Sequence, residues 1–135
     1  MTGAIEAVQR SLVAALQAHP PLVTAIDAIY DGPPPRAHFP YIALATGSAA
    51  DWSLKDRSGR RLSLALTVHD NGNSAARMHH VMGLIEQALD SGLNDPEDWQ
   101  IVTFIFRRSR IVRDAISPWT GLIEYRADVL QDFVI

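Results

Sequence analysis

The sequence contains no cysteine among its 135 residues. Disulfide bonds and thiolate metal sites are therefore excluded, and the absence suits a reducing cytoplasm. The sequence also has no run of about 18 apolar residues, so we expect no transmembrane helix and no membrane partner. Its first residues lack the basic stretch of a secretory signal, and we expect no signal peptide.

Lysine is nearly absent as well. Lys55 is the only one, and every other cation is an arginine, whose planar guanidinium suits bidentate pairing at interfaces. The formal net charge is −3, without the basic excess that a general nucleic-acid-binding protein carries. Four arginines nevertheless lie close together in the sequence: Arg107, Arg108, Arg110 and Arg113.

The motifs of common enzyme classes are also missing. There is no Gly-x-Ser-x-Gly elbow, no glycine-rich phosphate loop and no His-Glu-x-x-His pattern. Asp95, Glu97 and Asp98 could in principle supply an acid and a base. They fall in a polar stretch without apolar neighbours, so a solvated turn is the favoured interpretation. We therefore expect no catalytic residue and no cofactor.

Histidines offer the one alternative with metal chemistry. His69, His79 and His80 could approach one another, and Asp70 could add a carboxylate. Adjacent residues on a helix point about 100° apart, however, so His79 and His80 rarely bind one ion together. We expect no metal site, and exposed or interface histidines are favoured. A small histidine-based metal-binding protein or enzyme stays as the less favoured alternative.

The length and the hydrophobic content of 47% predict one globular domain over residues 1–135. Residues 4–18 have helical spacing of apolar side chains, at Ile5, Val8, Leu12 and Leu16. A second helix is predicted over 74–89, with Met78, Met82, Ile85 and Leu89 on one face. Residues 22–26 predict one further short helical turn after Pro20 and Pro21, which end the first helix.

Strands are predicted over 28–30, 41–46, 60–69, 99–113 and 122–134. The clearest is 60–69, where apolar and small or polar residues alternate. Residues 49–59 are polar and predict a long turn or hairpin connection, and a bulge is expected near Ser109. This order predicts an α+β fold: an antiparallel sheet, mixed at its edge, with two helices packed on one face.

A proline-rich stretch at 29–42 connects the strand predicted at 28–30 with the strand predicted at 41–46. Pro33, Pro34, Pro35 and Pro40 each fix φ and lack a backbone donor, which excludes a helix and a central strand. Asp31-Gly32 is typical of a turn. Because the stretch carries no nucleophile, base or ligand cluster, it indicates a structural or assembly role rather than catalysis.

Several segments together resemble a family of phage tail completion proteins, the tail terminators of long-tailed phages and phage-like gene transfer agents. They are Ile-Tyr-Asp-Gly-Pro-Pro-Pro at 29–35, Phe-Pro-Tyr-Ile at 39–42, Asp-Trp-Ser at 51–53 and Arg-Leu-Ser-Leu at 61–64, leading to Val68. The second helix and a final pair of strands follow at the expected distance. The resemblance covers nearly the whole chain.

The resemblance implies a structural virion protein and not an enzyme. Copies of the chain would form a ring, typically of six subunits, that caps the tail tube and ends its polymerisation. The implied partners are the chain itself, the tail tube protein and the head-side connector or stopper protein. DNA would pass through the ring without specific binding. The implied location is the bacterial cytoplasm during assembly and then the neck of the particle; the alternative is another neck component.

Three interpretations apply to the arginine cluster: phosphate contacts, salt bridges between subunits, and cross-strand pairing with Glu124 and Asp128. The last is favoured. Trp52 lies in a polar stretch and predicts either an interface contact or a side chain folded on its own sheet. The apolar C-terminal residues 132–135 predict docking in the sheet or on a neighbouring subunit. The interface candidates are Pro33, Pro34, Pro35, Trp52, Lys55, Arg57, Arg107, Arg108, Arg110, Arg113 and Ile135.

Overall fold

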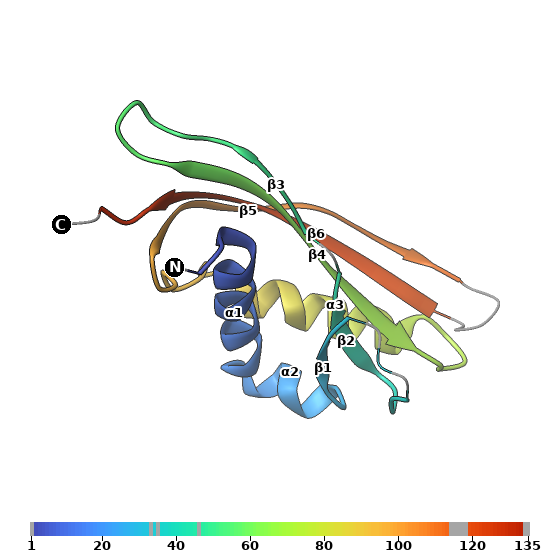
Figure 1. Ribbon diagram of the computed structural model, residues 1–135. Helices are drawn as coiled ribbons and strands as arrows, with labels where there is room; N and C mark the ends of the chain where they lie inside the picture. Colours follow the sequence, from blue (N-terminus) through green and yellow to red (C-terminus); the bar gives the residue numbers. More distant parts are fainter. Residues whose placement is uncertain (1, 33, 35, 46, 114–118, 134–135) are drawn as a thin grey trace.

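The structure is a computed structural model that describes residues 2–32, 34, 36–45, 47–113 and 119–133. Within these ranges, six strands form one mixed sheet in the order β1-β2-β4-β6-β5, with β3 also paired to β4. The helices pack against one face of this sheet (Figure 1). The predicted α+β class is confirmed, including the mixed edge.

The helices follow the predicted apolar spacing. In α1 (Ala4–Gln17), Val8, Leu12 and Leu16 are buried. In α3 (Ala76–Leu89), Met78, Met82, Ile85 and Leu89 are buried. The short α2 (Pro20–Ala25) begins two residues earlier than predicted, because Pro20 and Pro21 occupy its first turn, where a backbone N–H is not needed. None of the described helices is long and apolar enough to cross a membrane.

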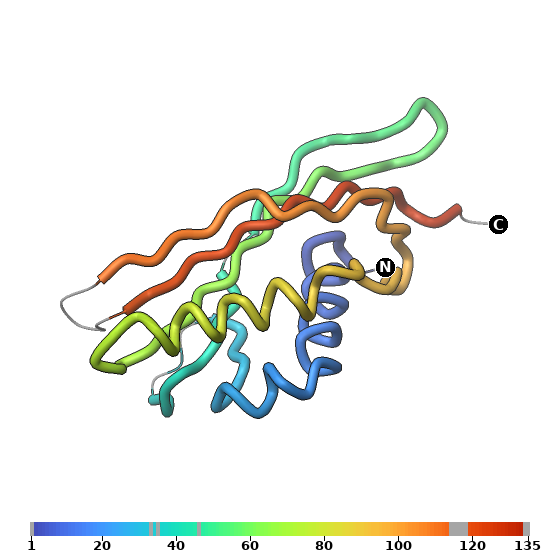
Figure 2. The backbone as a smooth tube through the Cα atoms, turned by 180° about the vertical axis from the view of Figure 1, so that it is seen from behind, coloured from blue at the N-terminus to red at the C-terminus, as the bar shows by residue number. Residues whose placement is uncertain are grey.

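Three long antiparallel strands form the body of the sheet: β4 (Gly59–Asp70), β6 (Trp119–Gln131) and β5 (Trp99–Val112). Their side chains alternate between the helix-covered face and an open face. On β4, for example, Leu62, Leu64, Leu66 and Val68 are buried under the helices. Figure 2 shows β5 and β6 side by side above α3.

At the other edge, β1 (Ile29–Asp31) and β2 (Tyr41–Leu44) are parallel neighbours. Parallel neighbours need a crossover connection, and here the proline-rich stretch provides it. Gly32 has a φ of 89°, as the predicted turn requires. The amide of Asp27 donates to the carbonyl of Pro40 at 2.8 Å, which ties the two ends of the stretch together. Pro34 is partly buried, whereas Pro33 and Pro35 lie outside the described residues.

The stretch 49–59 forms the predicted hairpin connection rather than a long turn. Its first residues belong to β3 (Ser48–Asp51), which pairs antiparallel with β4 from Arg60 to Ser63. The resulting hairpin extends beyond the helical layer (Figure 1). The Ser-Ala-Ala-Asp sequence of β3 has little intrinsic strand preference, so its conformation depends on the ladder that β4 offers.

The strand β5 has two irregular positions. Its register against β6 shifts between Ile101 and Thr103 and again between Phe106 and Arg108. The second shift lies close to Ser109, where a bulge is predicted, whereas the first is not expected from the sequence. Each shift inserts one residue that has no partner on β6. Arg107 is such a residue, whereas Arg108 and Arg110 lie opposite Glu124 and Leu122 and share the open face.

Candidate assembly interface

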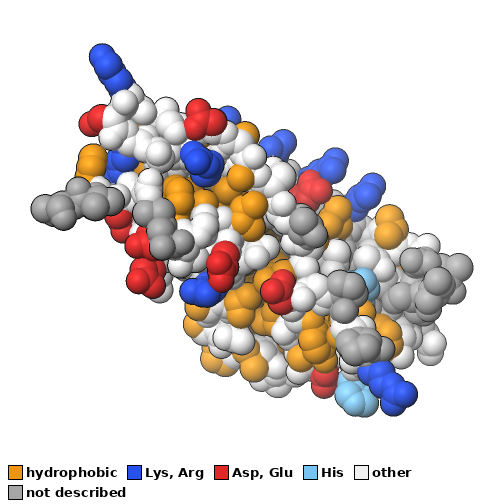
Figure 3. All heavy atoms as spheres, in the orientation of Figure 1, with side chains coloured by type: hydrophobic (Ala, Val, Ile, Leu, Met, Phe, Trp, Pro, Cys, Tyr) orange, Lys and Arg blue, Asp and Glu red, His pale blue; other side chains and the backbone are white. Residues whose placement is uncertain are grey.

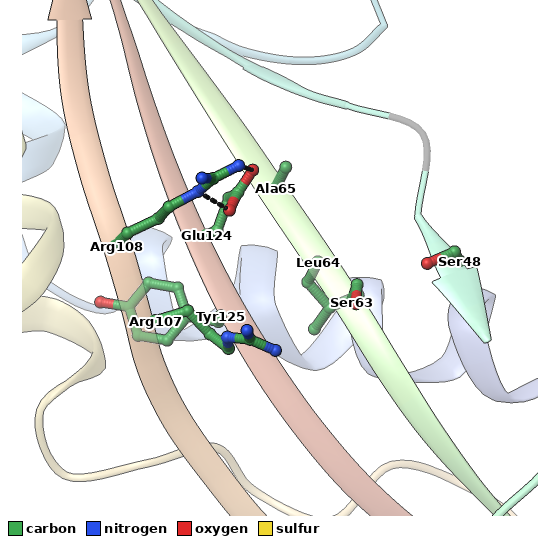
Figure 4. A pocket seen from close by; sticks show the side chains of 8 residues that line it. All are labelled: Ser48, Ser63, Leu64, Ala65, Arg107, Arg108, Glu124 and Tyr125. Carbon is green, nitrogen blue, oxygen red and sulfur yellow. Dashed lines mark hydrogen bonds and ion pairs between the residues drawn. The ribbon is translucent and has the colours of Figure 1, made fainter. Parts of the chain in front are cut away.

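The open face of the sheet carries a shallow hollow of about 420 Å³. It crosses four strands, and its lining includes Ser48 of β3, Ser63 and Ala65 of β4, Glu124 of β6, and Arg107 and Arg108 of β5. Figure 4 shows these side chains around the hollow. Small residues on β3 and β4 and long charged residues on β5 and β6 create the depression. Such a surface can receive a protein contact, but it lacks a nucleophile paired with a base.

Arg108 and Glu124 form a forked ion pair across β5 and β6. The Arg108 Nε donates to Glu124 Oε2 at 2.5 Å, and its Nη2 donates to Oε1 at 3.3 Å (Figure 4). The hydrogen bond from Arg108 lowers the pKa of Glu124, and the charges of Arg107 and Arg110 act in the same direction. The predicted cross-strand pairing is therefore confirmed for Arg108.

The expected pairing of the arginine cluster with Asp128 is wrong. Asp128 is 2% exposed and accepts a hydrogen bond from Arg61 Nε of β4 at 2.7 Å. Arg126, on the same strand as Asp128, lies 3.5 Å from the carboxylate. On β5 the partner of Asp128 is Thr103, so no arginine of the cluster stands opposite it.

The rest of the cluster is divided between two environments. The guanidinium of Arg113 lies 5.3 Å from the ring centroid of Trp119, a cation–π contact. Arg107 and Arg110 are exposed, and neither forms an ion pair within the described residues. Their charges are therefore available to a partner.

The interface candidates in the β3–β4 hairpin lie in different environments. Arg57 is bound within its own chain: its Nε donates to the Gln131 carbonyl at 2.5 Å, and its guanidinium lies 4.4 Å from the Phe133 ring centroid. These contacts hold the hairpin against the end of the sheet. Lys55 is exposed in the hairpin turn, and Trp52 is partly buried, so both stay predicted interface residues. Ile135 lies outside the described residues.

The remaining polar candidates have local roles. Asp95 accepts a hydrogen bond from the amide of Ile101 at 2.9 Å, and Asp98 from the amide of Thr2 at 3.2 Å. His69 stacks on Tyr41 with ring centroids 4.7 Å apart, and burial lowers its pKa. Among the described residues, no three histidine or carboxylate side chains gather as a metal site would require.

Sequence reasoning missed a row of exposed apolar side chains on β5. Val102, Ile105, Phe106 and Val112 are each between 42% and 48% exposed. Ile105 lies on the open face beside Arg108, whereas Phe106 points to the helical side and meets Tyr125 edge to face. The sequence signal for this row is that the strand carries apolar residues on both of its faces. The structure adds that β5 is an edge strand, which leaves one of its sides uncovered.

Tyr125 makes the stability of the protein sensitive to alkaline pH. Burial raises its pKa to about 12, with a further contribution from the charges of Glu86 and Asp90. Because the unfolded chain loses this proton near pH 10, folding is penalised as the pH rises from 10 towards 12. We expect Tyr125→Phe, which keeps the ring stacked on Phe104, to weaken that loss in denaturation series. Tyr30→Phe, at a partly buried tyrosine of β1, is the control; an equal effect of both changes would contradict this assignment.

A model of the family described as tail completion protein gp17 matches residues 10–129. Two solved structures share the fold. A chain of the "virion of native gene transfer agent (GTA) particle" is 22% identical with a TM-score of 0.83, over 96% of this chain and 99% of that one. The bacteriophage SPP1 gp17 protein is 18% identical with a TM-score of 0.62, over 90% and 88%. No curated protein matches the chain.

The family match and the architecture define a class: a structural component of phage tails, and not an enzyme. The chain belongs to the tail completion protein gp17 family. The resemblance found in the sequence is thereby confirmed.

Proposed function

We propose that this chain is the subunit of a ring that caps the tail tube, ends its polymerisation and joins the tail to the head-side connector. Membership of the tail completion family carries this proposal. The shared fold, over nearly the full length of a chain in a gene transfer agent particle, supports it. Residues 1–135 act as one tail-terminator-like domain, with six copies in the ring as the sequence resemblance implies.

The mechanism is geometric. A ring bound to the end of the tube covers the surface on which the next tube subunits would stack. Each interface is modest, but closure of the ring makes the contacts mutually dependent. The proposed contact residues are the exposed Arg107 and Arg110 of β5 and, in the β3–β4 hairpin, the exposed Lys55 and the partly buried Trp52. The stiff proline stretch 33–35 would lower the ordering cost of assembly.

DNA passes through this ring without being held. Each arginine that neutralises a phosphate strengthens salt-dependent binding, which would hinder passage. The ion pair of Arg108 with Glu124 and the stacking of Arg113 on Trp119 support a non-gripping surface. Assembly takes place in the bacterial cytoplasm, and the ring then stays at the neck of the phage or gene transfer agent particle.

Loss of the gene tests this function. We expect a strain without it to produce tubes of irregular length that do not join heads, as counted by electron microscopy. A plasmid copy of the wild-type gene should restore uniform, joined tails. Tails of normal, uniform length in the deletion strain would contradict the proposal. Density for the chain inside the connector, rather than at the tube end, would instead identify another neck component.

A further inference from the structure

Charge is unevenly distributed over the molecule. Most of the twelve cations lie on the β3–β4 hairpin, the open face and the β5 edge. Figure 3 shows a row of basic side chains along the margin formed by β5 and β6. The helical layer and its connections carry mainly acidic residues, among them Glu6, Asp27, Glu86, Asp90 and Glu97. Electrostatic attraction between two copies of the chain therefore requires that the basic surface of one copy meets the acidic surface of the other.

The β5 edge has the properties of a contact surface. It is the last strand of the sheet, so its outer side has no strand partner among the residues that the structure describes. The same strand carries exposed apolar side chains, such as Val102 and Ile105, and the charges of Arg107 and Arg110, which form no ion pair within the described part of the chain. A long edge strand with exposed apolar residues invites pairing or coverage. A partner of this edge needs apolar area and negative charge.

The opposite edge of the same sheet offers both apolar area and negative charge. A groove of about 340 Å³ runs between α1 and the β1–β2 edge. Its walls include Val13, Ala14 and Leu44, and its charged residues are Glu6, Arg10 and Asp31. Arg10 is already bound to Glu6 at 2.7 Å, whereas Asp31 is exposed and has no ion pair within the described residues. The groove therefore carries a net negative charge.

We propose that the β5 edge of one copy docks into the α1–β1 groove of the next copy. The inference rests on the proposed ring function and adds which surfaces meet. The two surfaces lie at opposite edges of one sheet, so the contact is head-to-tail and repeats until a ring closes. Arg107 and Arg110 face Asp31 across the contact, and Ile105 meets the apolar wall. A symmetric contact of β5 with β5 would instead oppose four unpaired arginines, and like charges destabilise an interface.

Two complementary variants test the pairing. The edge variant, Ile105→Glu with Arg110→Glu, keeps an intact groove. The groove variant, Gln17→Arg with Asp31→Arg, keeps an intact edge. We expect each one alone to lose at least about tenfold in self-association constant, the change expected for the loss of one close charge pair. Mixed in equal amounts, they should associate again, because the intact edge of one variant meets the intact groove of the other and the two mutated surfaces carry the reversed charges.

Light scattering over a concentration series measures the mass of the oligomers that the variants and their mixture form in solution. Chemical cross-linking of the chain bound to tube ends, followed by a mass measurement, gives the oligomers formed during assembly. A chain with Arg110→Glu and Asp31→Arg together should regain association through the reversed pair. The control is His80→Glu, an exposed position on α3 that does not line the groove. Edge or groove variants that assemble as the wild type does would overturn the pairing. So would a wild-type chain that stays monomeric both in solution and on tubes.

The outcomes separate the two proposals. If the wild-type chain forms rings and the variants form them equally well, the pairing is wrong while the ring function stands. If tails from the deletion strain are of normal length, the proposed function fails whatever the variants do.

Discussion

Replacing Arg77 with methionine should lower the free energy of unfolding by about 3 kcal/mol, the lower end of the range for breaking a buried ion pair. Asp70, at the end of β4, is completely buried, and Arg77 of α3 is its cationic partner. The Arg77 Nε donates to Asp70 Oδ1 at 2.9 Å, while Oδ2 has no hydrogen-bond partner within the described residues. Methionine fills a similar volume but leaves the carboxylate without compensation. Chemical denaturation of the variant measures the loss.

Two further variants make this expectation specific. Adding Asp70→Asn to Arg77→Met removes the buried charge and should recover part of the lost stability. Arg10→Met breaks the exposed pair with Glu6 in α1, where both side chains are more than 60% exposed. That change should cost less than about 1 kcal/mol. Equal losses for Arg77→Met and Arg10→Met would show that burial of Asp70 contributes nothing.

Replacing Gly59 with alanine should cost about 1–3 kcal/mol, as overpacking of a tight site does. A Cβ at this position would lie 2.4 Å from the Trp52 carbonyl oxygen and 2.9 Å from Leu130 Cδ2. The backbone there cannot yield easily, because the Trp52 amide donates to the Gly59 carbonyl at 3.0 Å and closes the hairpin. We expect the loss to appear in denaturation and as faster amide exchange in the β3–β4 hairpin.

Gly83→Ala is the matched control for Gly59→Ala. Gly83 lies inside α3, and a Cβ there would meet no atom within 4 Å. Alanine favours the helix over glycine by about 1 kcal/mol, so this variant should be slightly more stable than the wild type. If Gly83→Ala lowered the free energy of unfolding as much as Gly59→Ala does, the close contact at Gly59 would not be the cause of the lower stability.

The local pattern of apolar and polar residues was sufficient to predict the main helices and strands. The alternation in β4 and the helical spacing in α1 and α3 each place one apolar face, and burial of that face is the dominant gain on folding. The proline stretch was likewise understood as a non-helical connector. Its role as a crossover between the parallel strands β1 and β2 was not foreseeable, because strand direction depends on which neighbours the whole chain brings together.

The candidate interface was predictable only in part. Arg108 pairs with Glu124 as the cross-strand argument requires. Arg57 stays a predicted interface residue, and the structure adds its contacts with Gln131 and Phe133 of its own chain. The pairing partner of Asp128 also changed, from β5 to Arg61 of β4. In both cases the deciding contact joins residues far apart in the sequence, and periodicity carries no information about such contacts.

The sequence by itself determined the class of fold, the two long helices, the buried face of the sheet and the family. These depend on side-chain type and spacing, which act locally through burial and backbone preference. Only the tertiary structure decided which charges are already paired and which surfaces stay open. It places Arg107 and Arg110, which have no ionic partner among the described residues, at one edge of the sheet and Asp31 at the other. Register and bulges set these positions, and a shift of one residue in a strand reverses the face on which a side chain lies.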